Sequence, residues 1–93
     1  MNRLYGLIGF PLGHSFSARY FTEKFQRENL SGYEYRNFPL ESIRELPAML
    51  ENHPGLLGFN VTIPYKQEVI PFLTALSAEA REIGAVNCVK ITP

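Results

Sequence analysis

Residues 55 to 66 read G-L-L-G-F-N-V-T-I-P-Y-K, and this stretch decides the fold. Residues 55 to 62 are mostly apolar and end just before the turn-forming Pro64, which predicts a short buried strand. A short helix is expected to follow from Pro64 to about Pro71. A buried strand with helical segments around it is typical of α/β proteins.

Strands and helices alternate outward from this stretch. Further strands are predicted at residues 4–9, 33–38 and 85–91. Helices are predicted at residues 17–29, at 41–52 and between Ser77, the expected N-cap, and Gly84, the expected end. Pro47 is expected to kink or split the second of these helices. The alternation predicts an α/β fold, a three-layer α-β-α sandwich with a mostly parallel sheet, in a single domain over residues 1–93.

The composition limits the class of partner. Nine Lys and Arg balance nine Glu, and the chain has no Asp, so neither nucleic acid nor an anionic membrane surface is indicated as a partner. No uncharged stretch is long enough to span a bilayer, and the first residues lack the pattern of a secretory signal. One cysteine and two histidines at unrelated spacings predict no metal site. We therefore expect a cytoplasmic protein whose partner is a small molecule.

Polar side chains gather near the predicted carboxyl ends of the strands, where open parallel sheets bind their ligands. These candidate binding residues are Ser15, Ser17, Asn60, Thr62, Lys66 and Asn87. Because hydroxyls and amides both donate and accept hydrogen bonds, the set suits a polyhydroxylated ring. The N-terminus of the predicted helix at 17–29 favours a carboxylate on the same ligand.

Each candidate also has an ordinary structural interpretation. The serines can be helix N-caps, and Asn60 and Thr62 can organise their own turn. Lys66 can be a solvated surface charge, although a partly desolvated lysine at a strand end can act as an acid or base. Asn87 is expected inside the fourth strand, where a buried amide needs hydrogen-bond partners.

Two phosphate-binding motifs are missing from the sequence. Gly6, Gly9 and Gly13 do not form the G-x-G-x-x-G fingerprint of dinucleotide sites. The stretch 9–15 has a histidine where a phosphate-binding loop has its lysine.

Three segments together resemble the N-terminal substrate-binding domain of the shikimate dehydrogenase family. They read G-F-P-L-G-H-S-F-S at 9–17, G-F-N-V-T-I-P-Y-K at 58–66 and G-A-V-N-C-V at 84–89. The family patterns are G-x-P-x-x-H-S-x-S, G-x-N-V-T-x-P-x-K and G-A-V-N-T, and the resemblance covers essentially the whole chain. It implies an NADP-dependent oxidoreductase of aromatic amino acid biosynthesis that reversibly reduces 3-dehydroshikimate to shikimate.

The resemblance implies a role for each matching residue. Ser15 and Ser17 would bind the substrate carboxylate, and Asn60, Thr62 and Asn87 would bind and position the ring hydroxyls. Lys66 would be the catalytic acid and base on the hydroxyl that becomes a ketone.

The chain also departs from the family pattern. Ala18 and Phe21 stand where the family has Pro and His, and the aspartate that the family pairs with its lysine has no counterpart here. The NADP-binding Rossmann domain is absent from these residues. We therefore expect an isolated domain or short form that binds no cofactor alone, is inactive alone, and self-associates through its exposed cleft side.

Three alternatives stay open. A quinate or quinate/shikimate dehydrogenase shares the motifs, because one ring hydroxyl is too small a difference to read from the sequence. The second alternative is a non-catalytic module that binds a cyclic hydroxy acid, and the third is an interaction protein whose polar strand ends are only caps and turns.

Overall fold

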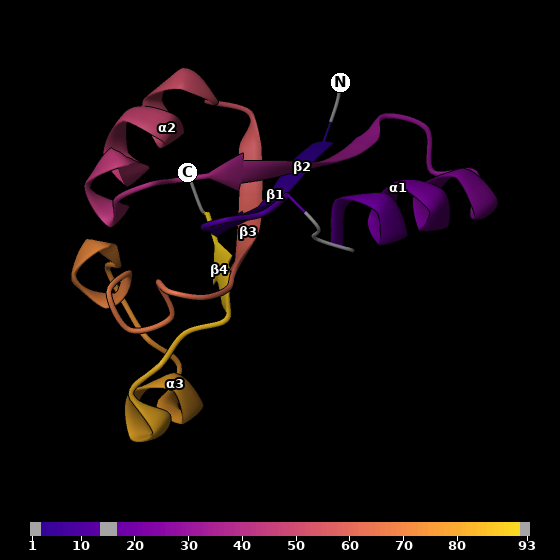
Figure 1. The fold of residues 1–93 in the computed structure, drawn as a ribbon. Coiled ribbons are helices and arrows are strands. Elements are labelled where there is room, and N and C mark those ends of the chain that lie inside the picture. The colour runs from indigo at the N-terminus through magenta and orange to yellow at the C-terminus, as the bar shows by residue number, and fades with distance from the viewer. Residues whose placement is uncertain (1–2, 14–16, 92–93) are drawn as a thin grey trace.

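The computed structural model describes residues 3–13 and 17–91, and a four-stranded sheet forms its centre (Figure 1). The strands lie in the order β2-β1-β3-β4. Their bounds are Arg3–Gly9 for β1, Tyr33–Pro39 for β2, Leu56–Val61 for β3 and Cys88–Lys90 for β4. β1 is parallel to both β2 and β3, whereas β4 is antiparallel to β3. The predicted mostly parallel sheet is confirmed.

Helices cover both faces of the sheet. The α-helices are α1 (Ser17–Arg27), α2 (Leu46–Asn52) and α3 (Ala78–Ile83), and the 3-10 helices are η1 (Ile43–Glu45) and η2 (Ile70–Phe72). The chain moves outward from β1 to β2 through α1 and then back across β1 to β3 through α2. Because crossovers between parallel strands are right-handed, these opposite directions put α1 and α2 on opposite faces. Figure 1 shows the two helices on either side of the strands, as the predicted three-layer arrangement requires.

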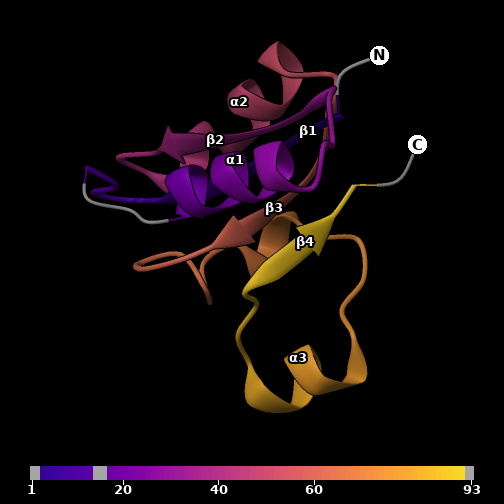
Figure 2. The same ribbon diagram turned by 90° about the vertical axis from the view of Figure 1, so that its right-hand side faces the viewer.

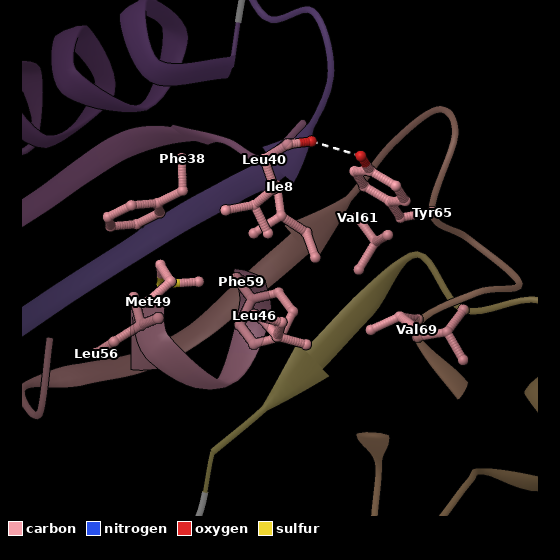
Figure 3. Close-up of a cluster of buried hydrophobic side chains, with 11 residues drawn as sticks. Ile8, Phe38, Leu40, Leu46, Met49, Leu56, Phe59, Val61, Tyr65 and Val69 are labelled. Atoms are coloured by element: carbon pink, nitrogen blue, oxygen red, sulfur yellow. Dashed lines mark hydrogen bonds between the residues drawn. The ribbon is translucent and has the colours of Figure 1, made fainter. Parts of the chain in front are cut away.

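Each face of the sheet has its own apolar cluster. On the α1 face, Leu7 and Tyr35 are buried beneath Phe21 and Phe25. The opposite face holds the larger cluster (Figure 3), whose buried members are Ile8, Phe38, Leu40, Leu46, Met49, Leu56, Phe59, Val61, Tyr65, Val69 and Val86. Neighbouring residues of β1 thus enter different clusters, because successive side chains of a strand point to opposite faces.

The predicted helix at 41–52 is split, as Pro47 indicated. Ser42 caps η1 in a capping box with Glu45, and α2 then begins at Leu46 with Pro47 in its first turn. Proline is tolerated there because the first helical N–H groups have no intrahelical acceptor.

The predicted helix from Pro64 to Pro71 is wrong. Only one α-type bond forms in this segment, from the Val69 N–H to the Tyr65 carbonyl, and η2 follows as a single 3-10 turn. Pro71 has no N–H to continue an α-helical ladder, so the segment closes in shorter turns.

The predicted fourth strand is shorter than expected. It begins at Cys88 rather than at residue 85, and its antiparallel direction places its first residues beside the last residues of β3. The helix before it is confirmed, with Ser77 as N-cap and Gly84 in the left-handed conformation at its end. Figure 2 shows β3 and β4 below α1, without a helix in front of them.

Candidate functional site

The carboxyl ends of β1 and β3 lie side by side and lead to opposite faces of the sheet. Such a switch point is where open α/β sheets bind ligands. The loops that follow the two strands are joined by backbone hydrogen bonds, from the Thr62 N–H to the Ile8 carbonyl (2.9 Å) and from the Phe10 N–H to the Ile63 carbonyl (3.1 Å). The peptide bonds before Pro11 and Pro64 are both cis. We refer to residues 10–13, 62–66 and 86–87 as the carboxyl-end loops.

Gly9 and Thr62 approach each other closely, so the loop after β1 packs directly on the loop after β3. A Cβ on Gly9 would lie 2.5 Å from Thr62 Cγ2 and 3.0 Å from the Ile63 carbonyl oxygen. Real Cβ atoms do not approach so closely, so a glycine is required. The half-buried side chain of Thr62 therefore packs by its methyl group against β1.

Lys66 follows a tight turn that begins at Thr62. The Tyr65 N–H donates to the Thr62 carbonyl (3.0 Å), and the Val86 N–H donates to the carbonyl of Lys66 itself (2.7 Å). The backbone of Lys66 is thus held between β3 and the segment before β4. Its side chain is exposed and makes no ion pair with the described residues. Of the two interpretations of Lys66, the chain as described matches the solvated side chain, because only the backbone enters the packing.

Tyr65 anchors the same turn from the other side. Its buried hydroxyl donates a hydrogen bond to the Leu40 carbonyl, just beyond the end of β2 (Figure 3). Burial raises the pKa of the Tyr65 phenol, and the negative charges of Glu68, Glu45 and Glu41 raise it further.

Asn87 lies immediately before β4, not inside it. Its backbone carbonyl accepts a hydrogen bond from the Val61 N–H at 2.9 Å, and its side chain is exposed. The prediction of a buried amide is wrong, because Val86 is the buried residue of this segment and β4 starts only at Cys88. The antiparallel pairing nevertheless brings Asn87 to the carboxyl end of β3.

Asn60 is the next-to-last residue of β3, and its side chain lies on the α1 face. Its Nδ2 donates a hydrogen bond to the Tyr35 hydroxyl at 2.8 Å. Tyr35 is buried and its ring stacks on Phe21, with centroids 4.7 Å apart. The alternating aromatic residues of 33–38 predicted a half-buried strand, but only the fold brings Tyr35 to Asn60.

The structure thus gathers four of the six candidates, Asn60, Thr62, Lys66 and Asn87, at one edge of the sheet. Ser15 lies outside the described residues. Ser17 is the first residue of α1, and its side chain also lies outside the description.

The described part of this edge offers two amides, a hydroxyl and one amine. Within residues 3–13 and 17–91 no group of three potential metal-ligating side chains comes together, and no helix is long and apolar enough to cross a membrane. A neutral, hydrogen-bonding set with a single cation suits a hydroxylated anion.

The comparison with protein families decides the identity. Residues 7–89 match the family described as the shikimate dehydrogenase substrate binding domain. The chain belongs to this family. The matched range includes the carboxyl-end loops, all of β3 and the end of β1 from Leu7 onward.

Individual relatives agree with the family assignment. Shikimate dehydrogenase (NADP(+)) of Carboxydothermus hydrogenoformans is 41% identical over 90 residues, which are 94% of this chain and 31% of that protein. The crystal structure of shikimate 5-dehydrogenase from Listeria monocytogenes in complex with shikimate and NAD is 33% identical, with a TM-score of 0.85 over 98% of this chain and 32% of that one. The chain spans about a third of the length of the relatives it matches.

A third neighbour has another activity in its name. The ligand-free 5-ketofructose reductase of a Gluconobacter strain is 26% identical, with a TM-score of 0.87 over 99% of this chain and 33% of that one. The substrate-binding domain fold of the shikimate dehydrogenase family is therefore shared by a reductase named for a different compound.

The described residues do not fit the NADP that these enzymes carry in their names. A dinucleotide site needs glycines after a strand so that the pyrophosphate can approach the backbone. Here Gly9, the last residue of β1, is already approached by the methyl group of Thr62. No dinucleotide-binding step is assigned to this chain.

Proposed function

We propose that this chain is the substrate-binding part of an NADP-dependent shikimate dehydrogenase and binds shikimate and 3-dehydroshikimate at its carboxyl-end loops. The observation that carries the proposal is the meeting of Asn60, Thr62, Lys66 and Asn87 at the carboxyl end of β3. Two backbone bonds hold this arrangement, from Val61 N–H to Asn87 and from Val86 N–H to Lys66.

In this proposal each group meets a different part of the ring. The amides of Asn60 and Asn87 and the hydroxyl of Thr62 bind ring hydroxyls, while Ser15 and Ser17, the first residue of α1, bind the carboxylate. A helix N-terminus favours a carboxylate through its free N–H groups and its positive dipole end.

Lys66 is proposed as the catalytic acid and base. Oxidation of an alcohol requires removal of the hydroxyl proton while hydride leaves the same carbon, and reduction requires the reverse. An exposed amine on a fixed backbone can reach a ring bound against the loops and exchange that proton. The 93 residues alone are proposed to bind no NADP and to catalyse no turnover.

Calorimetric titration of shikimate into the chain tests the proposal. We expect saturable heat, and Lys66→Ala is expected to weaken binding by about tenfold to a hundredfold, since hydrogen bonds to charged groups contribute about 1.5 to 3 kcal/mol. Lys90→Ala removes another exposed lysine, on β4, and serves as the matched control. No saturable heat from a folded chain would contradict the proposal.

The same titration separates the alternative substrates. Quinate carries a different set of ring hydroxyls, and 5-ketofructose represents the compound in the name of the Gluconobacter neighbour. We expect shikimate to bind most tightly, and tighter binding of either other compound would move the substrate assignment to it.

A further inference from the structure

Among the described residues, the Tyr35 hydroxyl is the one hydrogen-bond partner of the Asn60 side chain. We propose that Tyr35 is a positioning residue that sets which way the Asn60 carboxamide faces, so that the Oδ1 atom of Asn60 is presented to a ligand hydroxyl. This inference rests on the proposed function for its ligand, but the contact itself can be tested without one.

The contact spans the central strand of the sheet. Tyr35 lies on β2 and Asn60 on β3, and β1 runs between them. In the register, Tyr35 pairs with Tyr5 and Asn60 pairs with Leu7, so the bond connects the two outer neighbours of β1 diagonally across the α1 face. A bond between strands that do not pair directly requires two long side chains aimed at each other.

The tyrosine is fixed more firmly than the asparagine. Tyr35 is only 6% exposed, and its ring is stacked on Phe21 of α1 at 25° between the planes. Because the ring cannot move without disturbing α1, its oxygen is a fixed acceptor. The partly buried Asn60 has to adapt to it.

The polarity of the contact determines what Asn60 offers a ligand. Nδ2 is used as donor to the tyrosine oxygen, and Oδ1 accepts no hydrogen bond from the described part of the chain. Asn60 also lines a groove of about 390 Å³ on the α1 face, together with Tyr35. A free carbonyl oxygen accepts from a hydroxyl and repels a carboxylate or ketone oxygen. The arrangement therefore selects a hydroxyl over an oxo group at this position of the ring.

The first test uses the ligand-free chain. Tyr35→Phe keeps the ring against Phe21 and removes the hydroxyl that accepts from Asn60, so we expect the Asn60 side-chain NH₂ signals in ¹H–¹⁵N spectra to shift and to exchange faster with solvent. Tyr33→Phe is the matched control, because Tyr33 lies on the same strand and its hydroxyl accepts from Arg3 Nη1 instead.

The second test measures shikimate affinity. We expect Tyr35→Phe to weaken binding about fivefold, the equivalent of one net hydrogen bond, and to have a smaller effect when Asn60 is already alanine. A purely structural role of the hydroxyl would weaken binding equally in both backgrounds.

The outcomes separate this inference from the proposed function. If the wild-type chain does not bind shikimate, the proposed function fails, while the Asn60 signals of the free chain still decide the Tyr35 contact. The inference is overturned if Tyr35→Phe leaves those signals as Tyr33→Phe leaves them, or if its effect on affinity is equally large in Asn60→Ala.

Discussion

Single residues determine how closely the carboxyl-end loops pack on each other, and Gly9 is the clearest case. A methyl group at Gly9 has no room between Thr62 and the Ile63 carbonyl, so Gly9→Ala must push the two loops apart. We expect a loss of about 1 to 3 kcal/mol in the free energy of unfolding, measured in urea.

Gly13→Ala provides the control for this change. Gly13 lies in the same loop, and an added Cβ meets no atom within 4 Å. Equal stability of Gly9→Ala and Gly13→Ala would show that the close packing of Gly9 on Thr62 does not exist in solution.

The Tyr65 hydroxyl is a second residue-scale anchor. Tyr65→Phe leaves the buried Leu40 carbonyl without its donor, and we expect a loss of about 1 to 2 kcal/mol in unfolding free energy. Chemical denaturation at neutral pH measures this loss.

The pH dependence gives an independent check on Tyr65. Its folded-state pKa is raised above the ordinary value of 10.0, mainly by burial, so both states keep the phenol proton below that pH. Above it the unfolded state ionises first, and the stabilisation is lost as the pH rises. Stability should therefore fall more steeply above pH 10.0 in the wild type than in Tyr65→Phe, and parallel curves would refute the buried phenol.

At the scale of elements, α3 shows how a short helix can be specified by its ends. It has six residues, no buried side chain among them, a Ser77 cap and Gly84 at φ 76°. Gly84→Ala is expected to cost about 1 kcal/mol, because residues with a Cβ avoid this conformation. Gly55→Ala is the comparison, since Gly55 has no such backbone angle and open space around it. If Gly84→Ala and Gly55→Ala lower the thermal unfolding temperature equally, Gly84 is not in the left-handed conformation.

Elements with strong local signals were predictable from the sequence. The caps Ser77 and Gly84, the split at Pro47 and the apolar run of β3 all follow from residues next to the feature that they determine. The helix predicted after Pro64 was wrong, because Pro71 lacks the N–H donor that a continuing α-helix needs.

Long-range pairing limited the prediction of the site. The position of Asn60, Thr62 and Lys66 at the carboxyl end of β3 was predictable, because the three residues lie at or just beyond the end of one strand. The exposure of Asn87 depends on the antiparallel pairing of β4, and the Tyr35 contact depends on β1 lying between β2 and β3. Neither the pairing of β4 with β3 nor the order of β2, β1 and β3 can be read from the spacing of residues close in sequence.

At the scale of the whole molecule, the carboxyl-end loops expose apolar side chains. Ile63 is 74% exposed and Phe10 is 41% exposed, and their backbones are hydrogen-bonded to each other. We expect the chain to self-associate weakly through this side, because burying two such side chains removes apolar surface from water. Sedimentation velocity should show an average mass that rises with concentration.

Ile63→Gln is expected to reduce this association. Ile83→Gln is the matched control, since Ile83 is also 74% exposed but lies on α3. A strictly monomeric wild type at high concentration would contradict the prediction, as would equal effects of the two substitutions.

The central claim is that the carboxyl-end loops form a site for a hydroxylated cyclic acid. Titration of shikimate into the ¹⁵N-labelled chain tests it most directly, because every backbone amide reports separately. We predict that saturable shifts concentrate at residues 60–66 and 86–88, with the Asn60 side-chain signals among them. Shifts confined to other elements, or no shifts at millimolar shikimate, would contradict the claim.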